Sequence, residues 1–323
     1  MMQHTDDACA TMLLTSQITP TRQELALPLN TGEWHRLREL VRQSGLSGMG
    51  ELMRLDLSGM MLKLGITEEE AYRICVLLGR MLPLSFSLEG FALRGVDILC
   101  IEEKAYPARL RAVLGTKAPP QIYLAGRHEL FRQRAVGIVG AQTARGKGEE
   151  KARQIARFAA ECGYVVVSDG VAGAGRAAED EAIRAGGKAI EATADALAAR
   201  AAEPDMKAWL SVRSAAAFSL VHPDAPFTVS HALNRNKALY ALCDAVFVMS
   251  CESERGVAFQ GAAEAVRNRY CDYVYVRTED DEPAAGALCA KGAKPLGEIS
   301  KQAFERMAEV WRGAQAEQIS IFD

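Results

Sequence analysis

A glycine-rich loop at Gly140–Gly148 carries the first set of residues suited to binding an anion. Its glycines permit close backbone approach, and the amides of a following helix attract phosphate. Its polar and charged side chains are Gln142, Arg145 and Lys147. The loop matches neither the P-loop nor the G-x-G-x-x-G pattern. It therefore indicates either a phosphate site or a plain turn with solvated cations.

A second glycine-rich loop spans Ser168–Arg176. Gly170, Gly173 and Gly175 fall within six residues, between a Val-rich segment and a predicted helix. Glycines at this density indicate that the backbone packs closely against either a ligand or a neighbouring loop. Arg176 is the only cation in the loop.

The third candidate segment is Asn234-Arg235-Asn236-Lys237. Two cations flanking an amide suit a phosphodiester or another anion. An ordinary charged helix face has the same pattern, so both interpretations stay open. The chain as a whole has 38 Lys and Arg against 41 Asp and Glu, a net charge of −3. Any polyanion site must therefore be a local basic patch.

We find no catalytic or metal-binding constellation in the sequence. The five histidines lack metal-binding spacing, and no serine occupies a G-x-S-x-G turn. Glu179 and Glu264, in predicted helices near the loops, are expected to be surface carboxylates. The eight cysteines include no C-x-x-C pair, which predicts reduced thiols in a cytoplasm. We expect no cofactor, no metal, no membrane span and no secretory signal.

Alternating strands and helices must position these loops. Strands are expected at 97–101, 136–139, 164–167, 188–192, 218–221, 245–249 and 273–276, and helices at 149–162, 177–185, 229–242 and 259–268. Repeated β-α-β units predict a parallel, Rossmann-like sheet covered by helices on both faces. Ligands bind beyond the carboxyl ends of such strands. The three loops are therefore expected to converge in one electropositive cleft.

The rest of the chain divides by composition. Residues 1–30 are expected to be a loose segment, 31–97 a small helical packing or interaction domain, and 98–278 the Rossmann-like domain. Residues 279–316 are expected to form a linker and a helix at about 299–311, with Ile299, Phe304, Met307 and Trp311 on one side. Residues 317–323 are expected to be an exposed tail.

Several short motifs, in order and spacing, resemble the DNA-processing protein A (Smf) family. They are Tyr106-Pro107-x-x-Leu110, Pro119-Pro120, Leu124-x-Gly126, Val136–Gly140, Ser168–Ile183, Gly186-Gly187-Lys188 and Arg235-Asn236-Lys237 followed by Leu242–Val248. The resemblance covers about 98–276. It implies a Rossmann-like fold without established catalysis that binds single-stranded DNA along a basic surface. It also implies a homodimer that loads a RecA-type recombinase onto that DNA.

Carried over by position, the resemblance makes Arg235 and Lys237 DNA-contacting cations, with Asn236 ordering their loop. The chain departs from the family elsewhere, because Gln142 and Ala172 stand where family members have arginines. Arg145 or Lys147 would have to replace the first, and Arg176 the second. If these replacement cations do not reach the phosphates, DNA affinity falls, because neutralisation of phosphate charge supplies much of the free energy of non-specific binding.

Two other functional classes remain open at this stage. The scaffold also suits a nucleotide-binding sensor or a nucleotide-cleaving enzyme, and a degenerate scaffold that only recruits partners is a third possibility. Single-strand binders combine charge with base stacking, and Phe227 and Tyr240 are the nearest aromatic candidates.

The last residues contain a separate motif, Gln318-Ile319-Ser320-Ile321-Phe322. It is similar to the pentapeptide Gln-Leu-Ser-Leu-Phe with which bacterial proteins engage the replicative sliding clamp. Ile321 and Phe322 would enter an apolar pocket while Gln318 bonds at its rim. The alternative is a tail that packs on its own domain.

Overall fold

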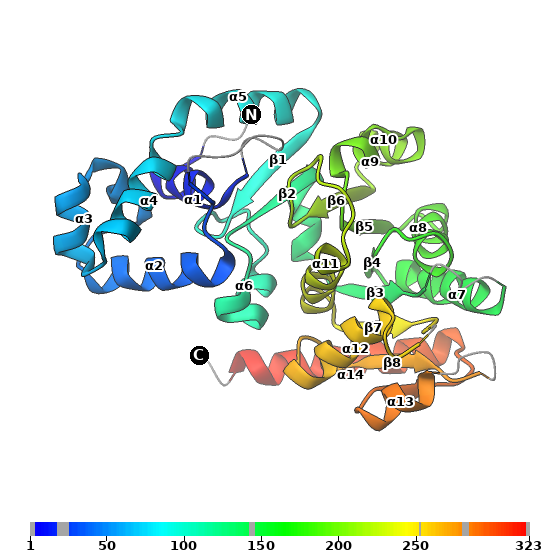
Figure 1. Cartoon of the computed structure of the whole chain (residues 1–323). Coiled ribbons are helices and arrows are strands. Elements are labelled where there is room, and N and C mark those ends of the chain that lie inside the picture. Colours follow the sequence, from blue (N-terminus) through cyan, green and yellow to red (C-terminus); the bar gives the residue numbers. More distant parts are fainter. Residues whose placement is uncertain (1–3, 18–25, 142–145, 252, 280–283, 321–323) are drawn as a thin grey trace.

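The computed structural model describes residues 4–17, 26–141, 146–251, 253–279 and 284–320, with backbone alone over 314–320. These residues form a nine-stranded sheet in the order β1-β2-β6-β5-β4-β3-β7-β8-β9 (Figure 1). The strands are β1 (Val96–Cys100), β2 (Gln121–Gly126), β3 (Ala135–Val139), β4 (Val165–Ser168), β5 (Lys188–Thr193), β6 (Ala215–Ser219), β7 (Ala245–Val248), β8 (Val274–Arg277) and β9 (Lys294–Leu296).

The helices that surround the sheet are α1 (Asp6–Thr15), α2 (Thr31–Gln43), α3 (Leu57–Leu64), α4 (Glu68–Leu78), α5 (Met81–Leu93), α6 (Ala108–Leu114), α7 (Lys147–Glu161), α8 (Ala174–Arg184), α9 (Leu197–Ala202), α10 (Pro204–Ser211), α11 (Val229–Leu242), α12 (Val257–Asn268), α13 (Ala285–Ala290) and α14 (Lys301–Ser320). Three short 3₁₀ turns, η1 (Met49–Arg54), η2 (Gly115–Lys117) and η3 (His128–Arg132), join them within the described residues.

The prediction of a Rossmann-like α/β sheet is confirmed, but the sheet is mixed. Neighbouring strands from β6 to β9 are parallel. β1 and β2 add an antiparallel extension beside β6. The β-α-β pattern predicts only the parallel part, because antiparallel neighbours need no crossover helix of that kind.

Helices cover the two faces of the sheet with different partners. Val136, Ile138 and Phe247 point to the face on which α7, α8 and α14 pack. Val139, Val246 and Val248, from the alternate positions, pack with α11 and α12 on the other face. In Figure 1, α11 accordingly lies across the sheet from α7 and α8.

Helix α14 closes the first face with its aromatic side chains. Phe304 and Trp311 are buried, and their ring centroids lie 6.3 and 6.1 Å from that of Phe247. The predicted apolar side of this helix is therefore confirmed, with Ile299 buried and Met307 partly buried beside it. The helix continues to Ser320, beyond its predicted end at about 311.

The first segment is not loose throughout, which corrects the prediction for residues 1–30. Residues 6–15 form α1, whose Met12, Leu13 and Leu14 are fully buried. Thr5 caps the N-terminus of the helix, because its side chain accepts a 3.2 Å hydrogen bond from the Ala8 amide. Because α1 is buried on several sides, it lacks the one-sided apolar stripe by which a surface helix is predicted. The apolar core continues from α1 through α2–α5 into the sheet.

Membrane-spanning potential in the described residues is limited to one bent helix pair. No single helix there is both long and apolar enough to cross a bilayer. α4 and α5, which meet at a 47° bend, meet the criterion only as a pair, by length and composition.

Candidate functional site

The loops after β3 and β7 meet at the carboxyl edge of the sheet. The Ala141 amide donates a 3.2 Å hydrogen bond to the Ser250 carbonyl. A Cβ at Gly140 would lie only 3.2 Å from the Cβ of Ala174, so glycine lets this loop lie close to α8. The chain leaves β3 and β7 toward opposite faces of the sheet here, which is the usual place for a ligand in such folds.

The glycine-rich loop after β4 is closed on itself. The Gly170 amide donates to Ser168 Oγ at 2.9 Å, and the Val171 amide donates to Asp169 Oδ1 at 3.2 Å. Gly170 has a φ of +65°, and a Cβ there would lie 2.5 Å from Glu191 Oε1. Gly173 precedes α8 with a φ of +101°. Here the glycine at 170 brings the backbone against a side chain of the same protein.

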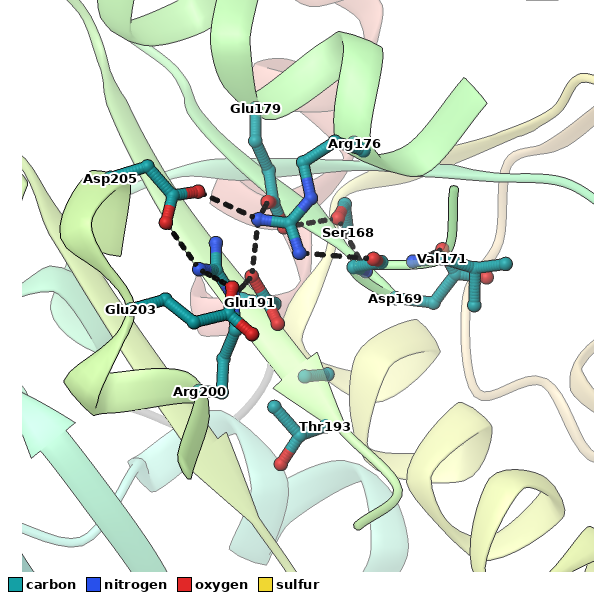
Figure 2. A network of polar contacts seen from close by, with 12 residues as sticks. Ser168, Asp169, Val171, Arg176, Glu179, Glu191, Thr193, Arg200, Glu203 and Asp205 are labelled. Atoms are coloured by element: carbon teal, nitrogen blue, oxygen red, sulfur yellow. Dashed lines mark hydrogen bonds and ion pairs between the residues drawn. The ribbon is translucent and has the colours of Figure 1, made fainter. Parts of the chain in front are cut away.

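Two buried carboxyl groups meet beneath this loop (Figure 2). Glu179 of α8 is 0% exposed and Glu191 of β5 is 4% exposed. Ser168 Oγ donates to Glu179 Oε1, and Arg200 Nε donates to Glu191 Oε2 at 2.7 Å. The expectation that Glu179 is a surface carboxylate is wrong. Glu264, 22% exposed at its side chain, is also partly covered.

Both carboxyl groups have raised pKa values. Burial raises the pKa of Glu179 well above its usual range, and the neighbouring charge of Glu191 raises it further. Burial raises the pKa of Glu191 to about 7, against the opposing effect of Arg176. Because Glu191 lies against two arginines, its pKa is raised less than that of Glu179.

Arg176 forms ion pairs with acidic side chains of the same protein. Its NH1 lies 3.2 Å from Asp205 Oδ2, 3.4 Å from Glu191 Oε2 and 3.6 Å from Glu179 Oε2. Arg176 was predicted to replace a lost phosphate ligand, but three carboxylates surround its guanidinium. Sequence spacing could not show these contacts, because Glu191 and Asp205 come from later elements.

Arg235 is an interior residue, which corrects its expected place on a basic surface. It is 4% exposed, and its NH1 donates to the carbonyls of Asp169 and Ala192 at 2.8 and 2.9 Å. Its Nε donates to Asn236 Oδ1 at 2.9 Å. Arg235 thus ties α11 to the loop after β4 and to β5.

Asn236 connects two helices from the same buried position. It is 4% exposed, and its Nδ2 donates to the Val257 carbonyl at 3.2 Å. A Cβ at Gly261 of α12 would meet Asn236 Nδ2 at 2.3 Å, so the two helices approach closely at this point. The amide therefore holds α11 to α12.

The expected single electropositive cleft is wrong. Lys237 lies on α11 and Lys147 begins α7, and these helices cover opposite faces of the sheet (Figure 1). Lys237 Nζ contacts Asn234 Oδ1 at 3.2 Å and Glu264 Oε1 at 3.6 Å. Lys147 is exposed. Gln142 and Arg145 lie outside the described residues.

A groove of about 660 Å³ follows α7 toward the ends of β8 and β9, and the sequence analysis missed it. Its lining is Lys147, Glu150, Lys151, Arg153, Gln154, Arg157, Phe158, Glu279, Glu298 and Ile299. Four of these side chains are cations and three are acids. Lys147 and Lys151, like Arg153 and Arg157, are four residues apart, a spacing that puts each pair on one side of a helix.

Most cations of the α7 groove already have an acidic neighbour. Lys151 Nζ lies 3.0 Å from Glu279 Oε1, and Arg153 NH2 lies 2.9 Å from Glu149 Oε1. Arg157 pairs with Glu181 at 2.6 Å, although its side chain is 56% exposed. Lys147 has no ion pair with any residue in the described part of the chain.

The aromatic candidates differ in their accessibility. Tyr240 is 1% exposed, so it cannot stack on a base, which corrects that expectation. Phe227 is 56% exposed. Phe158, which the sequence analysis did not single out, is partly buried and lines the α7 groove.

The described residues contain no group of three or more His, Cys, Asp or Glu side chains arranged to hold a metal ion. The eight cysteines are free thiols. In the terminal motif, Gln318, Ile319 and Ser320 belong to the backbone of α14. Their side chains, together with Ile321 and Phe322, lie outside what the structure describes.

Comparison with known proteins identifies relatives of this chain by sequence and by structure. Residues 97–306 match the family model of the DNA recombination-mediator protein A. DNA processing protein A from Streptococcus pneumoniae has a similar structure, with a TM-score of 0.57 and 19% identity over 85% of this chain and 96% of that one. DNA processing protein A from Helicobacter pylori, described with its own single-stranded DNA binding mode, has a TM-score of 0.53 and 19% identity over 66% of this chain and 95% of that one. No curated protein sequence matches.

Proposed function

Since this chain belongs to the DNA recombination-mediator protein A family, we propose that it binds single-stranded DNA without catalysing a reaction on it. We further propose that the α7 groove holds the phosphates. The observation that supports this choice is the row of cations beside Phe158 in a groove of about 660 Å³. Single-strand binders combine such charge with an aromatic side chain on which a base stacks.

The positions that the family resemblance pointed to supply little accessible charge in this chain. Gln142 and Ala172 replace two arginines. Arg176 is surrounded by carboxylates and Arg235 is buried. The α7 groove is the alternative at the same carboxyl edge, because α7 begins there and its Lys147 has no acidic partner in the described residues.

The double variant Lys147→Ala/Lys151→Ala is expected to bind a single-stranded oligonucleotide about tenfold more weakly. Each lost phosphate contact also removes about 0.7 from the slope of log affinity against log salt, so the slope falls by about 1.4. Fluorescence anisotropy at several salt concentrations measures both quantities.

Lys207→Ala is the matched control, since Lys207 is an exposed lysine of α10 outside the groove. An equal loss of affinity in this variant would show that only net charge matters and would refute the groove. Absent or salt-insensitive DNA binding, together with thermal stabilisation by a mononucleotide, would instead favour the nucleotide-sensor alternative.

We propose a homodimer and a RecA-type recombinase as partners, and both rest on the family membership. Analytical sedimentation measures whether the chain forms a dimer. The rate of recombinase filament formation on single-stranded DNA coated with this protein measures loading of the recombinase. A cytoplasmic location is proposed because the eight thiols are free, as in a reducing compartment.

Deleting residues 318–323 is expected to abolish capture of the protein by an immobilised bacterial sliding clamp. We propose the terminal motif as the clamp ligand, in which Ile321 and Phe322 fill an apolar pocket. An extended bound peptide requires residues 318–320 to leave the helical conformation of α14. Phe322→Ala alone should reduce capture strongly, and undiminished capture of the deletion variant would refute the assignment.

A further inference from the structure

A second cavity, of about 470 Å³, lies between the N-terminal helices and the sheet. Its lining is Thr15, Leu29, Asn30, Thr31, Gly32, Leu114, Thr116, Lys117, Pro119, Pro120, Gln121, Leu220, Val221, Asn234 and Lys237. These residues come from α1, α2 and the segment before it, α6, η2, β2 and the segment before it, the loop after β6, and α11. We call it the edge cavity.

The edge cavity lies at the carboxyl edge of the parallel strands. Leu220 and Val221 directly follow β6, which is parallel to β5. Gln121 begins β2, which runs antiparallel to β6, so its first residues reach the same edge. Loops at this edge carry the ligand sites of open α/β sheets. The volume is within the range of small-molecule sites.

The chemistry of the lining favours an anion. Two lysines are present and none of the lining residues is an Asp or Glu. Three threonines and the side chains of Asn30, Gln121 and Asn234 supply neutral polar groups. Pro119, Pro120 and Leu220 form an apolar part. A ligand with a charged end and a flat, partly apolar body fits such a mixture.

Lys117 has its charge available for a ligand. Its Nζ contacts the Tyr270 hydroxyl at 3.2 Å and Asn268 Oδ1 at 3.5 Å, and it has no carboxylate partner among the described residues. Lys237 has one, Glu264 Oε1, at 3.6 Å. Lys117 is therefore held in place by neutral groups, whereas Lys237 is held by Asn234 and Glu264, and both lysines line the same cavity.

The start of α2 borders the edge cavity, with a capping box of Asn30 and Glu33 at its N-terminus. Thr31 and Gly32 are the first two residues of this 13-residue helix and line the edge cavity. Helix N-termini present backbone amides and the positive end of the helix dipole. The carboxylate of Glu33 accepts from the Asn30 amide and from Arg73, and Glu33 is not part of the lining.

We infer that the edge cavity binds a nucleoside phosphate, with Lys117 and Lys237 holding the phosphate and the apolar wall contacting the base. This ligand has two sources, a free mononucleotide or the phosphorylated end of a DNA strand. The site is separate from the α7 groove, because α11 and α7 cover opposite faces of the sheet. The inference therefore goes beyond the proposed function and does not depend on the groove.

Calorimetric titration of the full chain with adenosine and thymidine 5′-monophosphate tests the first source. Binding is expected, and Lys117→Ala and Lys237→Ala should each weaken it about tenfold. Lys207→Ala, which removes an exposed lysine elsewhere, should have no effect. Lys147→Ala/Lys151→Ala should also leave it unchanged, which separates this site from DNA binding in the α7 groove.

Paired oligonucleotides that differ only in a 5′-phosphate or a 5′-hydroxyl test the second source. Tighter binding of the phosphorylated strand, lost in Lys117→Ala and Lys237→Ala, would assign the site to a strand end. The inference is overturned if neither mononucleotide binds and the two strands bind equally. It is also overturned if binding persists undiminished in both lysine variants, with circular dichroism confirming that they are folded.

Discussion

Arg235→Ala is expected to lower the free energy of unfolding by about 3 kcal/mol or more. The substitution removes a buried guanidinium and leaves the carbonyls of Asp169 and Ala192 without that donor. It also removes the partner of Asn236 Oδ1 at the contact between α11 and α12. Urea unfolding followed by circular dichroism measures the loss.

Lys237→Ala, two residues along the same helix, is the control for Arg235→Ala. The Lys237 side chain is 32% exposed, so its removal should change the free energy of unfolding by less than about 0.5 kcal/mol. A variant at Arg235 that unfolds like the wild type but loses DNA affinity would contradict the structural role. Arg235 would then be a DNA contact, as the family resemblance implies.

The stability of the protein is expected to fall as the pH rises through neutrality. Glu179 has a pKa well above its usual range and Glu191 one of about 7, so the folded state keeps a proton that the unfolded state releases near pH 4.5. The stabilisation is full below that unfolded pKa and is lost as the pH rises through the folded values. Each pKa unit corresponds to about 1.4 kcal/mol, so the titration of Glu191 by itself predicts a loss of about 1.4 kcal/mol between pH 6 and 9, and Glu179 adds to it.

Glu179→Gln should flatten this dependence and stabilise the protein at pH 8. The amide keeps a donor toward Glu191 and an acceptor for Ser168 Oγ, without a proton to lose. Some dependence should persist, because burial also raises the pKa of Glu102 to about 7 and raises that of Asp169. Thermal unfolding from pH 5 to 9 measures it, with exposed Glu309→Gln as the control. An unchanged profile in Glu179→Gln would mean that another group causes the dependence on pH.

The intramolecular contacts of Arg235 and Arg176 limit what the family resemblance implies about DNA-binding residues in this chain. Arg235 and Arg176 are cations at or beside family motifs, yet both are used to stabilise the interior. Conversely, Lys151, Arg153 and Arg157 of the α7 groove belong to no motif, and only Lys147 was among the candidate residues of the first glycine-rich loop. The resemblance identifies the fold and the class of function, and the accessible charge has to be found in the structure.

The sequence by itself determined the alternating elements and the family. Short apolar runs such as Val136–Val139 are typical of buried strands, and the spacing of Phe304 and Trp311 is typical of one side of a helix. Such patterns are visible in the sequence because they follow from the local geometry of each element. The same information predicted loops at the carboxyl ends of the strands. It indicated a strand at 97–101, close to β1, but it missed β2 and the antiparallel pairing, because pairing between strands is not a local property.

A charged residue in mid-strand was an available signal that the sequence analysis did not use. Glu191 lies between Ile190 and Ala192 in a strand with neighbours on both sides, where an acid must be buried and paired. Its partner Glu179 was not identifiable in this way, since a helix also has an exposed face.

Only the tertiary structure decided which cations are accessible and which meet. Whether α11 lies on the same face as α7 depends on the direction in which the chain leaves β6 and β3, and nothing in the spacing of Arg235 or Lys147 encodes that direction. The edge cavity likewise joins Lys117 to Lys237, 120 positions apart in the sequence. Charge and residue type are properties of the sequence, whereas solvent access and juxtaposition arise from long-range packing.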